Sequence, residues 1–132
     1  MYKGTIVNDI TVTANTNIPF TTKLNTNGNT SYDATNNVIN ILNSGLYNVD
    51  LMVNMTDVAV GDVSIQLVGD GVVIPETVLT ATSGSVTDAL NFSVHDTIRV
   101  SPTVANTFAT IGVQATVGGT ISNAILTVEK VR

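Results

Sequence analysis

Cysteine is absent from this chain of 132 residues, so neither disulfide bonds nor thiolate chemistry contributes to its stability or function. Aromatic residues make up only 5% and tryptophan is missing, so the core has to be built from valine, isoleucine, leucine and alanine. Charged residues account for 11%, against about 25% in an average domain. Threonine, asparagine and serine therefore form the solvated surface, which suits a rigid β protein whose surface is partly covered by partners.

Basic residues are few and scattered. The chain has five of them, at Lys3, Lys23, Arg99, Lys130 and Arg132, and its formal net charge is -5. Nucleic-acid binding needs clustered cations that displace counterions from phosphates, so this partner class is excluded.

Long hydrophobic runs are also missing. No segment approaches the ~20 apolar residues that cross a bilayer, and residues 1–5 lack the apolar core of a signal peptide. We therefore expect no membrane partner and synthesis as a soluble cytoplasmic chain, unless the chain is excised from a longer one. Such a chain could still leave the cell inside a particle released by lysis.

The dominant pattern in the sequence is an every-other-residue alternation over residues 45–56. Tyr47, Val49, Leu51, Val53 and Met55 are apolar, and most of the residues between them are polar. Side chains on a strand point alternately to opposite faces, so the pattern predicts a long strand with one face in a core.

Shorter alternating runs fill the rest of the chain, and no segment has helical period. Strands are predicted at 4–12, 38–42, 62–68, 72–74, 78–82, 110–117 and 121–131. About eight to ten short strands separated by turn residues are typical of an antiparallel sandwich or jelly roll. We expect an all-β fold and a single domain spanning residues 1–132.

Three segments carry more specific expectations. Residues 89–100 predict two short runs, because Asp96 falls at an inward position, and a turn or bulge at His95-Asp96 would resolve this conflict. Gly118-Gly119 is a hairpin signal. Residues 25–37 are almost wholly Asn, Thr, Gly and Ser, which predicts a surface loop or a ragged hairpin.

Some apolar residues fall on the polar faces of the predicted strands. Met52 lies between Asp50 and Asn54, while Ile125 and Val131 lie opposite the inward positions of the last strand. Isolated exposed apolar residues need no explanation. Several on neighbouring strands would instead indicate a sheet covered on both faces, by other copies of the chain.

Residues able to carry catalysis or bind a metal are sparse. His95 is the only histidine; parity places it on the polar face, as a surface or interface residue that could make assembly pH-sensitive. A lone histidine cannot close a metal site, and no Ser-His-Asp arrangement surrounds it. Asp57 and Asp62 flank one loop, so a calcium ion bound between them is an alternative that the sequence leaves open, although their spacing matches no EF-hand. We expect no enzyme activity, catalytic residue, cofactor or metal.

Four stretches carry a resemblance to a known family. Residues 39–49 look like an apolar strand followed by Gly, any residue, Tyr and an apolar residue, and 63–74 look like a hairpin with Gly69-Asp70-Gly71 at its turn. Residues 90–100 are similar to a segment in which Asp precedes an alternating Val-rich strand, here at 96–100, and 124–128 fit a last strand. In this order they resemble the tumour-necrosis-factor-like jelly roll, which complement-type globular heads, a spore-surface glycoprotein head and trimeric phage proteins also use.

The resemblance, which covers residues 18–132, implies a homotrimer. The first strand, the last strand and the 45–55 strand would share the inner sheet, and Met52 and Ile125 would face the three-fold axis. Together with parity, this makes Met52, Ile125, Val131 and His95 the candidate trimer interface.

The leading hypothesis is a structural protein of a bacteriophage virion: a capsid decoration, head-fibre or fibre-tip protein. It would be made in the host cytoplasm, and its partners would be itself and other virion proteins. Loop residues Asn27, Gly28, Asn29 and Asp70 would remain for outside contacts. The alternative is a receptor- or glycan-binding adhesion module of a phage tail or spore surface, whereas an enzyme would need a converged carboxylate pair.

Overall fold

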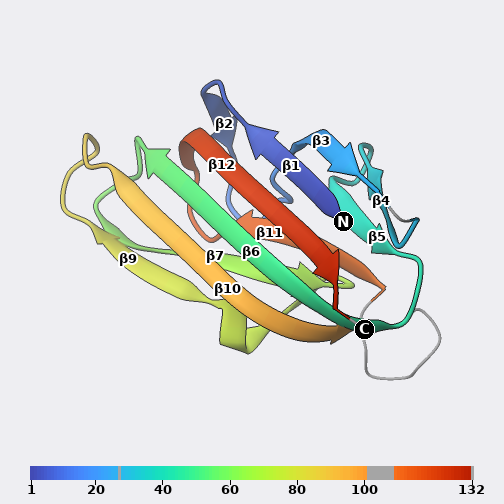
Figure 1. The fold of residues 1–132 in the computed structure, drawn as a ribbon. Helices are drawn as coiled ribbons and strands as arrows, with labels where there is room; N and C mark the ends of the chain where they lie inside the picture. Colours follow the sequence, from blue (N-terminus) through green and yellow to red (C-terminus); the bar gives the residue numbers. More distant parts are fainter. Residues whose placement is uncertain (27, 101–108, 132) are drawn as a thin grey trace.

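Two antiparallel sheets stack face to face in the computed structural model, which describes residues 1–26, 28–100 and 109–131 (Figure 1). The strands are β1 (Tyr2–Ile6), β2 (Ile10–Val12), β3 (Thr21–Asn25), β4 (Thr30–Asp33), β5 (Val38–Ile41), β6 (Gly45–Thr56), β7 (Gly61–Gly69), β8 (Val72–Val73), β9 (Leu79–Ser83), β10 (Leu90–Val100), β11 (Thr110–Ala115) and β12 (Gly119–Lys130). A single 3-10 turn, η1 (Pro75–Thr77), precedes β9 in this part of the chain.

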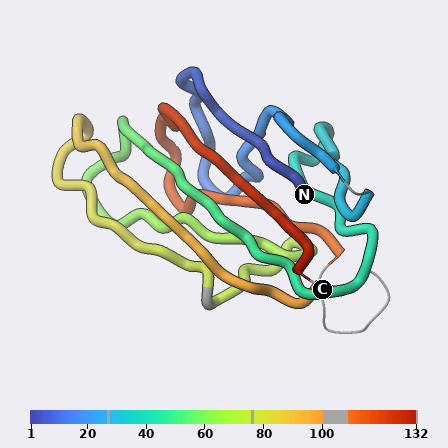
Figure 2. The backbone as a smooth tube through the Cα atoms, viewed as in Figure 1, coloured from blue at the N-terminus to red at the C-terminus, as the bar shows by residue number. Residues whose placement is uncertain are grey.

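The first sheet has the strand order β10-β6-β12-β1-β3, and β2 also pairs with β12. The second has the order β4-β5-β11-β7-β8, and β9 also pairs with β7. Most neighbours are distant in sequence, as in a jelly roll, and both chain ends lie at the same end of the sandwich, opposite the loop that joins β9 to β10 (Figure 2). The predicted sharing of one sheet by the first, last and 45–55 strands is confirmed.

The alternation over residues 45–56 produces one uninterrupted strand, β6, as predicted. Its inward side chains Tyr47, Val49, Leu51, Val53 and Met55 are at most 2% exposed and pack in the core between the sheets. Because these residues are aliphatic or aromatic and repeat with period 2, one face of β6 is dry along its whole length.

The predicted strand at 4–12 is instead two strands, β1 and β2, and both pair with β12. The chain leaves the ladder at residues 7–9, and on its other side β12 has a register shift against β6 between Ile121 and Asn123. Val7, Asn8 and Asp9 are exposed there. The polar residues Asn8 and Asp9 interrupt the apolar pattern, which explains the break.

The expected turn or bulge at His95-Asp96 was wrong. β10 pairs with β6 without a register shift from Leu90–Met55 to Val100–Gly45. Asp96 therefore lies opposite Val49 with its side chain on the core side, and the Thr97 N–H donates to its Oδ1 over 2.9 Å. The long ladder with β6 outweighs the cost of one inward carboxylate.

Gly118-Gly119 forms no hairpin, because β11 and β12 belong to different sheets. A Cβ at Gly118 would lie 3.0 Å from the Val12 carbonyl oxygen, and one at Gly119 would lie 3.0 Å from that of Thr56. The glycines permit a close backbone approach where the chain crosses between the sheets.

Within the predicted surface loop or ragged hairpin at 25–37, residues 30–33 form a regular strand. Thr30–Asp33 form β4, which pairs with β5 in the second sheet, whereas β3 lies in the first. The described part of the chain thus has twelve strands, more than the predicted eight to ten. The additional strands are short and polar, so alternation could not reveal them.

Candidate interaction face

One side of the first sheet packs against the second sheet. No strand of the described chain covers its other side. We define the outer face as the side chains of β10, β6, β12 and β1 that point away from the core. Alternation fixes its members: even-numbered residues of β6 and odd-numbered residues of β10. Most are Ser, Thr or Asn, as the composition requires.

Two apolar residues lie side by side in the middle of the outer face. Met52 on β6 pairs in register with Ile125 on β12, and the two are 39% and 38% exposed. The same cross-strand row continues to Ser93 on β10 and Thr5 on β1. Cross-strand neighbours on one face have their Cβ atoms about 5 Å apart, so the two side chains form one continuous apolar spot.

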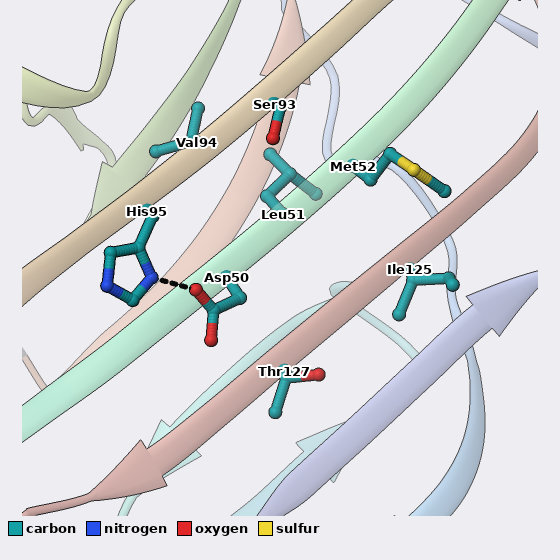
Figure 3. A pocket seen from close by; sticks show the side chains of 8 residues that line it. All are labelled: Asp50, Leu51, Met52, Ser93, Val94, His95, Ile125 and Thr127. Atoms are coloured by element: carbon teal, nitrogen blue, oxygen red, sulfur yellow. Dashed lines mark hydrogen bonds and ion pairs between the residues drawn. The ribbon is translucent and has the colours of Figure 1, made fainter.

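A hollow of about 200 Å³ opens on the outer face next to this spot (Figure 3). Its lining residues are Asp50, Leu51, Met52, Ser93, Val94, His95, Ile125 and Thr127. Met52 and Ile125 border it on one side, and His95 and Asp50 border it on the other. The structure therefore brings together three of the four residues predicted for an interface: Met52, Ile125 and His95.

His95 and Asp50 form an ion pair at the edge of the hollow. The Nδ1 atom of His95 contacts Oδ1 of Asp50, and the two residues are direct partners in the β10–β6 ladder. The pKa of His95 is raised above its ordinary value, first by this hydrogen bond and then by the charge of the Asp50 carboxylate. Desolvation of the His95 ring lowers the pKa in part, and the charge of Asp96 adds the smallest upward shift.

The permanent charges of the outer face balance. By strand parity, Lys3 and Arg99 supply two positive charges, and Asp50 and Glu129 supply two negative charges. Eight of the ten acids and three of the five bases of the chain lie elsewhere. The outer face is thus a region where identical copies of this acidic chain can approach with little mutual repulsion.

Val131, the fourth predicted interface residue, lies away from the hollow. It follows β12, is 50% exposed, and its N–H donates to the Leu46 carbonyl over 2.7 Å. Six residues of extended chain separate it from Ile125, which is about 20 Å. Parity still places it on the outer face, near the end of the sandwich where the termini lie.

The loop residues predicted for outside contacts differ in exposure and in the hydrogen bonds that they make within the chain. Asn27 lies outside the described residues, and Gly28 is exposed with a φ of 64°. Asn29 is held by two hydrogen bonds, one from the Leu42 N–H and one from the Asn43 side chain. Asp70 forms a tight Asp-Gly turn between β7 and β8, and its carboxylate accepts internal hydrogen bonds from Ala109 and Thr110.

Sequence reasoning missed Asp50 and Thr127. Both belong to polar positions of well-predicted strands, and only the strand pairing shows that they lie beside His95 and Ile125.

The calcium site left open between Asp57 and Asp62 gains no support from the side chains. Asp62 accepts a hydrogen bond from the Thr82 hydroxyl. Within residues 1–26, 28–100 and 109–131, no group of three or more His, Cys, Asp or Glu side chains is arranged to hold a metal ion. The same residues contain no helix long and apolar enough to cross a membrane.

No family model and no curated protein matches this sequence. Solved structures do match the fold. The Eiger TNF of S. frugiperda is 8% identical with a TM-score of 0.72, and the alignment covers 99% of this chain and 93% of that one. The PRD1 vertex protein P5 is 16% identical with a TM-score of 0.65, covering 99% and 72%. Murine APRIL is 10% identical with a TM-score of 0.63, covering 97% and 98%. The chain has the tumour-necrosis-factor-like jelly-roll fold that its sequence motifs resemble.

Proposed function

We propose that this chain is a non-enzymatic structural protein of a virion that assembles through its outer face into a homotrimer. The observation that carries the proposal is the exposed Met52–Ile125 pair at the centre of a face with balanced charge. Burying apolar surface stabilises association by ~25 cal/mol per Å² removed from water. The balanced charges of the outer face keep repulsion low at the contact itself, although each chain carries a net charge of -5.

The size of the outer face is adequate for this role. Stable interfaces bury about 800 Å² per partner. At a strand spacing of about 4.8 Å, the three long strands β6, β10 and β12, each about 40 Å, and the short β1, about 17 Å, present roughly 640 Å². The side of the first sheet thus offers an area close to that of a specific interface.

The virion role is supported by the fold likeness to a phage vertex protein and by the composition. A rigid, cysteine-free β sandwich with few charges and hydroxyl- and amide-rich surfaces suits a protein that functions as part of a particle. Capsid decoration, a head fibre and a fibre tip are the roles we propose, with other virion proteins as further partners. Mass spectrometry of purified particles from the source culture tests this, and absence of the chain from them would contradict it.

The assembly itself is tested by a charge placed in the apolar spot. We expect the wild-type protein to sediment as a trimer at micromolar concentration, and Met52→Asp and Ile125→Asp to sediment as folded monomers. Val60→Asp is the matched control, because Val60 is 71% exposed in the loop between β6 and β7, away from the outer face. Circular dichroism checks that each variant folds. A wild-type protein that remains a monomer would refute the proposal.

A further inference from the structure

The His95–Asp50 pair lies where a copy packed on the outer face would cover it. The two side chains border the same hollow as Met52 and Ile125, and in the single chain they are 72% and 53% exposed. His95 is the only histidine of the sequence. It is thus the only residue of this sequence whose side chain has an ordinary pKa between about 5 and 8.

The other charges around Asp50 are too distant to replace His95. In the same cross-strand row Thr127 follows on β12, and Lys3 lies one strand further on β1, about 10 Å from Asp50. Glu129 in the adjacent row of β12 adds a second negative charge.

The remaining neighbours of His95 give Asp50 no cation either. On β10 itself, Asp96 points to the opposite face and Arg99 lies four residues away. β9, which runs near β10, has no titratable residue. Protonated His95 is therefore the one cation in contact with the Asp50 carboxylate among the described residues.

We propose that self-association of the outer face is favoured by acid, because His95 must hold a proton to neutralise Asp50 when a second copy covers the hollow. This inference rests on the proposed function. Removing water from a paired carboxylate costs far less free energy than removing it from an unpaired one. The assembled state therefore retains a proton on His95 that the separate chains release as the pH rises.

The direction of the pH dependence follows from linkage. Acid favours the state that binds more protons. For each proton taken up on association, the association constant rises by up to tenfold for every unit by which the pH falls. The raised pKa of His95 in the single chain has the same origin and the same sign. Association is expected to be strongest between about pH 5 and 6.5 and to weaken as the pH rises through the raised pKa.

Sedimentation equilibrium at about pH 5.5 and about pH 8.5 tests the proposal. We expect the wild-type dissociation constant to be at least about tenfold larger at the higher pH. His95→Asn should associate more weakly at the lower pH and change less than about twofold between the two.

A second pair of variants separates the ion pair from general charge effects. Asp50→Asn leaves His95 without its carboxylate, so covering the hollow then disfavours the protonated ring, and association should weaken in acid. Asp9→Asn removes the same charge from the exposed break between β1 and β2, and should keep the wild-type dependence.

Each outcome of these measurements decides a claim. A trimer whose dissociation constant does not change with pH, or rises in acid, overturns this inference and leaves the proposed function standing. A wild-type pH dependence that His95→Asn retains also overturns it, because a group other than His95 then carries the titration. A chain that is monomeric at both pH values overturns the proposed function and this inference with it.

Discussion

Asp70 shows how one side chain can hold two distant parts of the chain together. It adopts a φ of 50° in the Asp70-Gly71 turn, a left-handed conformation that Asp tolerates better than most residues. Its carboxylate accepts hydrogen bonds from the backbone N–H of Ala109, at 2.9 Å, and of Thr110, at 3.0 Å. The start of β11 is thereby tied to the β7–β8 turn.

Replacing Asp70 should therefore destabilise the fold. We expect Asp70→Ala to lower the free energy of unfolding by about 2 kcal/mol, because two backbone N–H groups lose a charged acceptor and Ala disfavours the left-handed conformation. Asp70→Gly removes the carboxylate without the backbone strain, so it should lose less. Urea unfolding measures both, with the exposed Asp9→Ala as control. Equal stability of Asp70→Ala and wild type would show that the hydrogen bonds contribute nothing.

The sequence correctly predicted a turn at Asp70 but not what its side chain does. Asp-Gly between two apolar runs is a local signal, so the turn could be predicted. The donors to the carboxylate come from residues 109 and 110, which are 39 and 40 positions away in the sequence. A contact at that separation depends on the strand order, and for this reason the sequence alone predicts only outside contacts for Asp70.

β10 is an edge strand, and Asp96 is its most unusual residue. In the part of the chain that the structure describes, β10 pairs with β6 only, so one side of its eleven residues lacks a ladder partner. Asp96 points inward between Val94 and Ile98, and its Oδ2 is buried without a hydrogen-bond partner. Inward charges on edge strands prevent edge-to-edge pairing between molecules, at a cost in stability.

Substitution of Asp96 should therefore separate stability from solubility. We expect Asp96→Val to raise the free energy of unfolding by about 1 kcal/mol, since it removes an incompletely paired polar group. The same change should increase aggregation through β10, seen as light scattering at high concentration. Asp96→Asn, which keeps the shape but not the charge, should aggregate less than Asp96→Val. If Asp96→Val is both more stable and equally soluble, the edge-protection role is wrong.

At the scale of whole strands, the sequence predicted which residues face the core better than which strands pair. The alternation of β6 and the apolar runs of β7 and β12 depend on local period, and their inward residues are buried as expected. The pairing of His95 with Asp50, 45 residues apart, depends on the β10–β6 register instead. Gly118-Gly119 illustrates the same limit: its glycines are needed for close approach between distant strands, which no local pattern encodes.

For the whole molecule, the decisive question is whether the outer face is covered. β6 carries an internal comparison, because Met52 and Met55 lie three residues apart on opposite faces of one strand. Met55 is fully buried in the core, whereas Met52 is 39% exposed on the outer face. The two thioethers therefore report separately on the core and on the outer face.

Methionine oxidation by dilute hydrogen peroxide uses this comparison. Oxidation follows exposure of the sulfur, so Met52 should react readily in dilute monomeric protein and slowly at concentrations where the trimer forms. Met55 should stay protected at both concentrations, because only unfolding exposes it. Peptide mass spectrometry quantifies each site, and Val60→Asp, which leaves the outer face intact, should show the same protection as wild type. Equal oxidation of Met52 in monomer and trimer would mean that the copies meet through a different surface, even if the sedimentation data show a trimer.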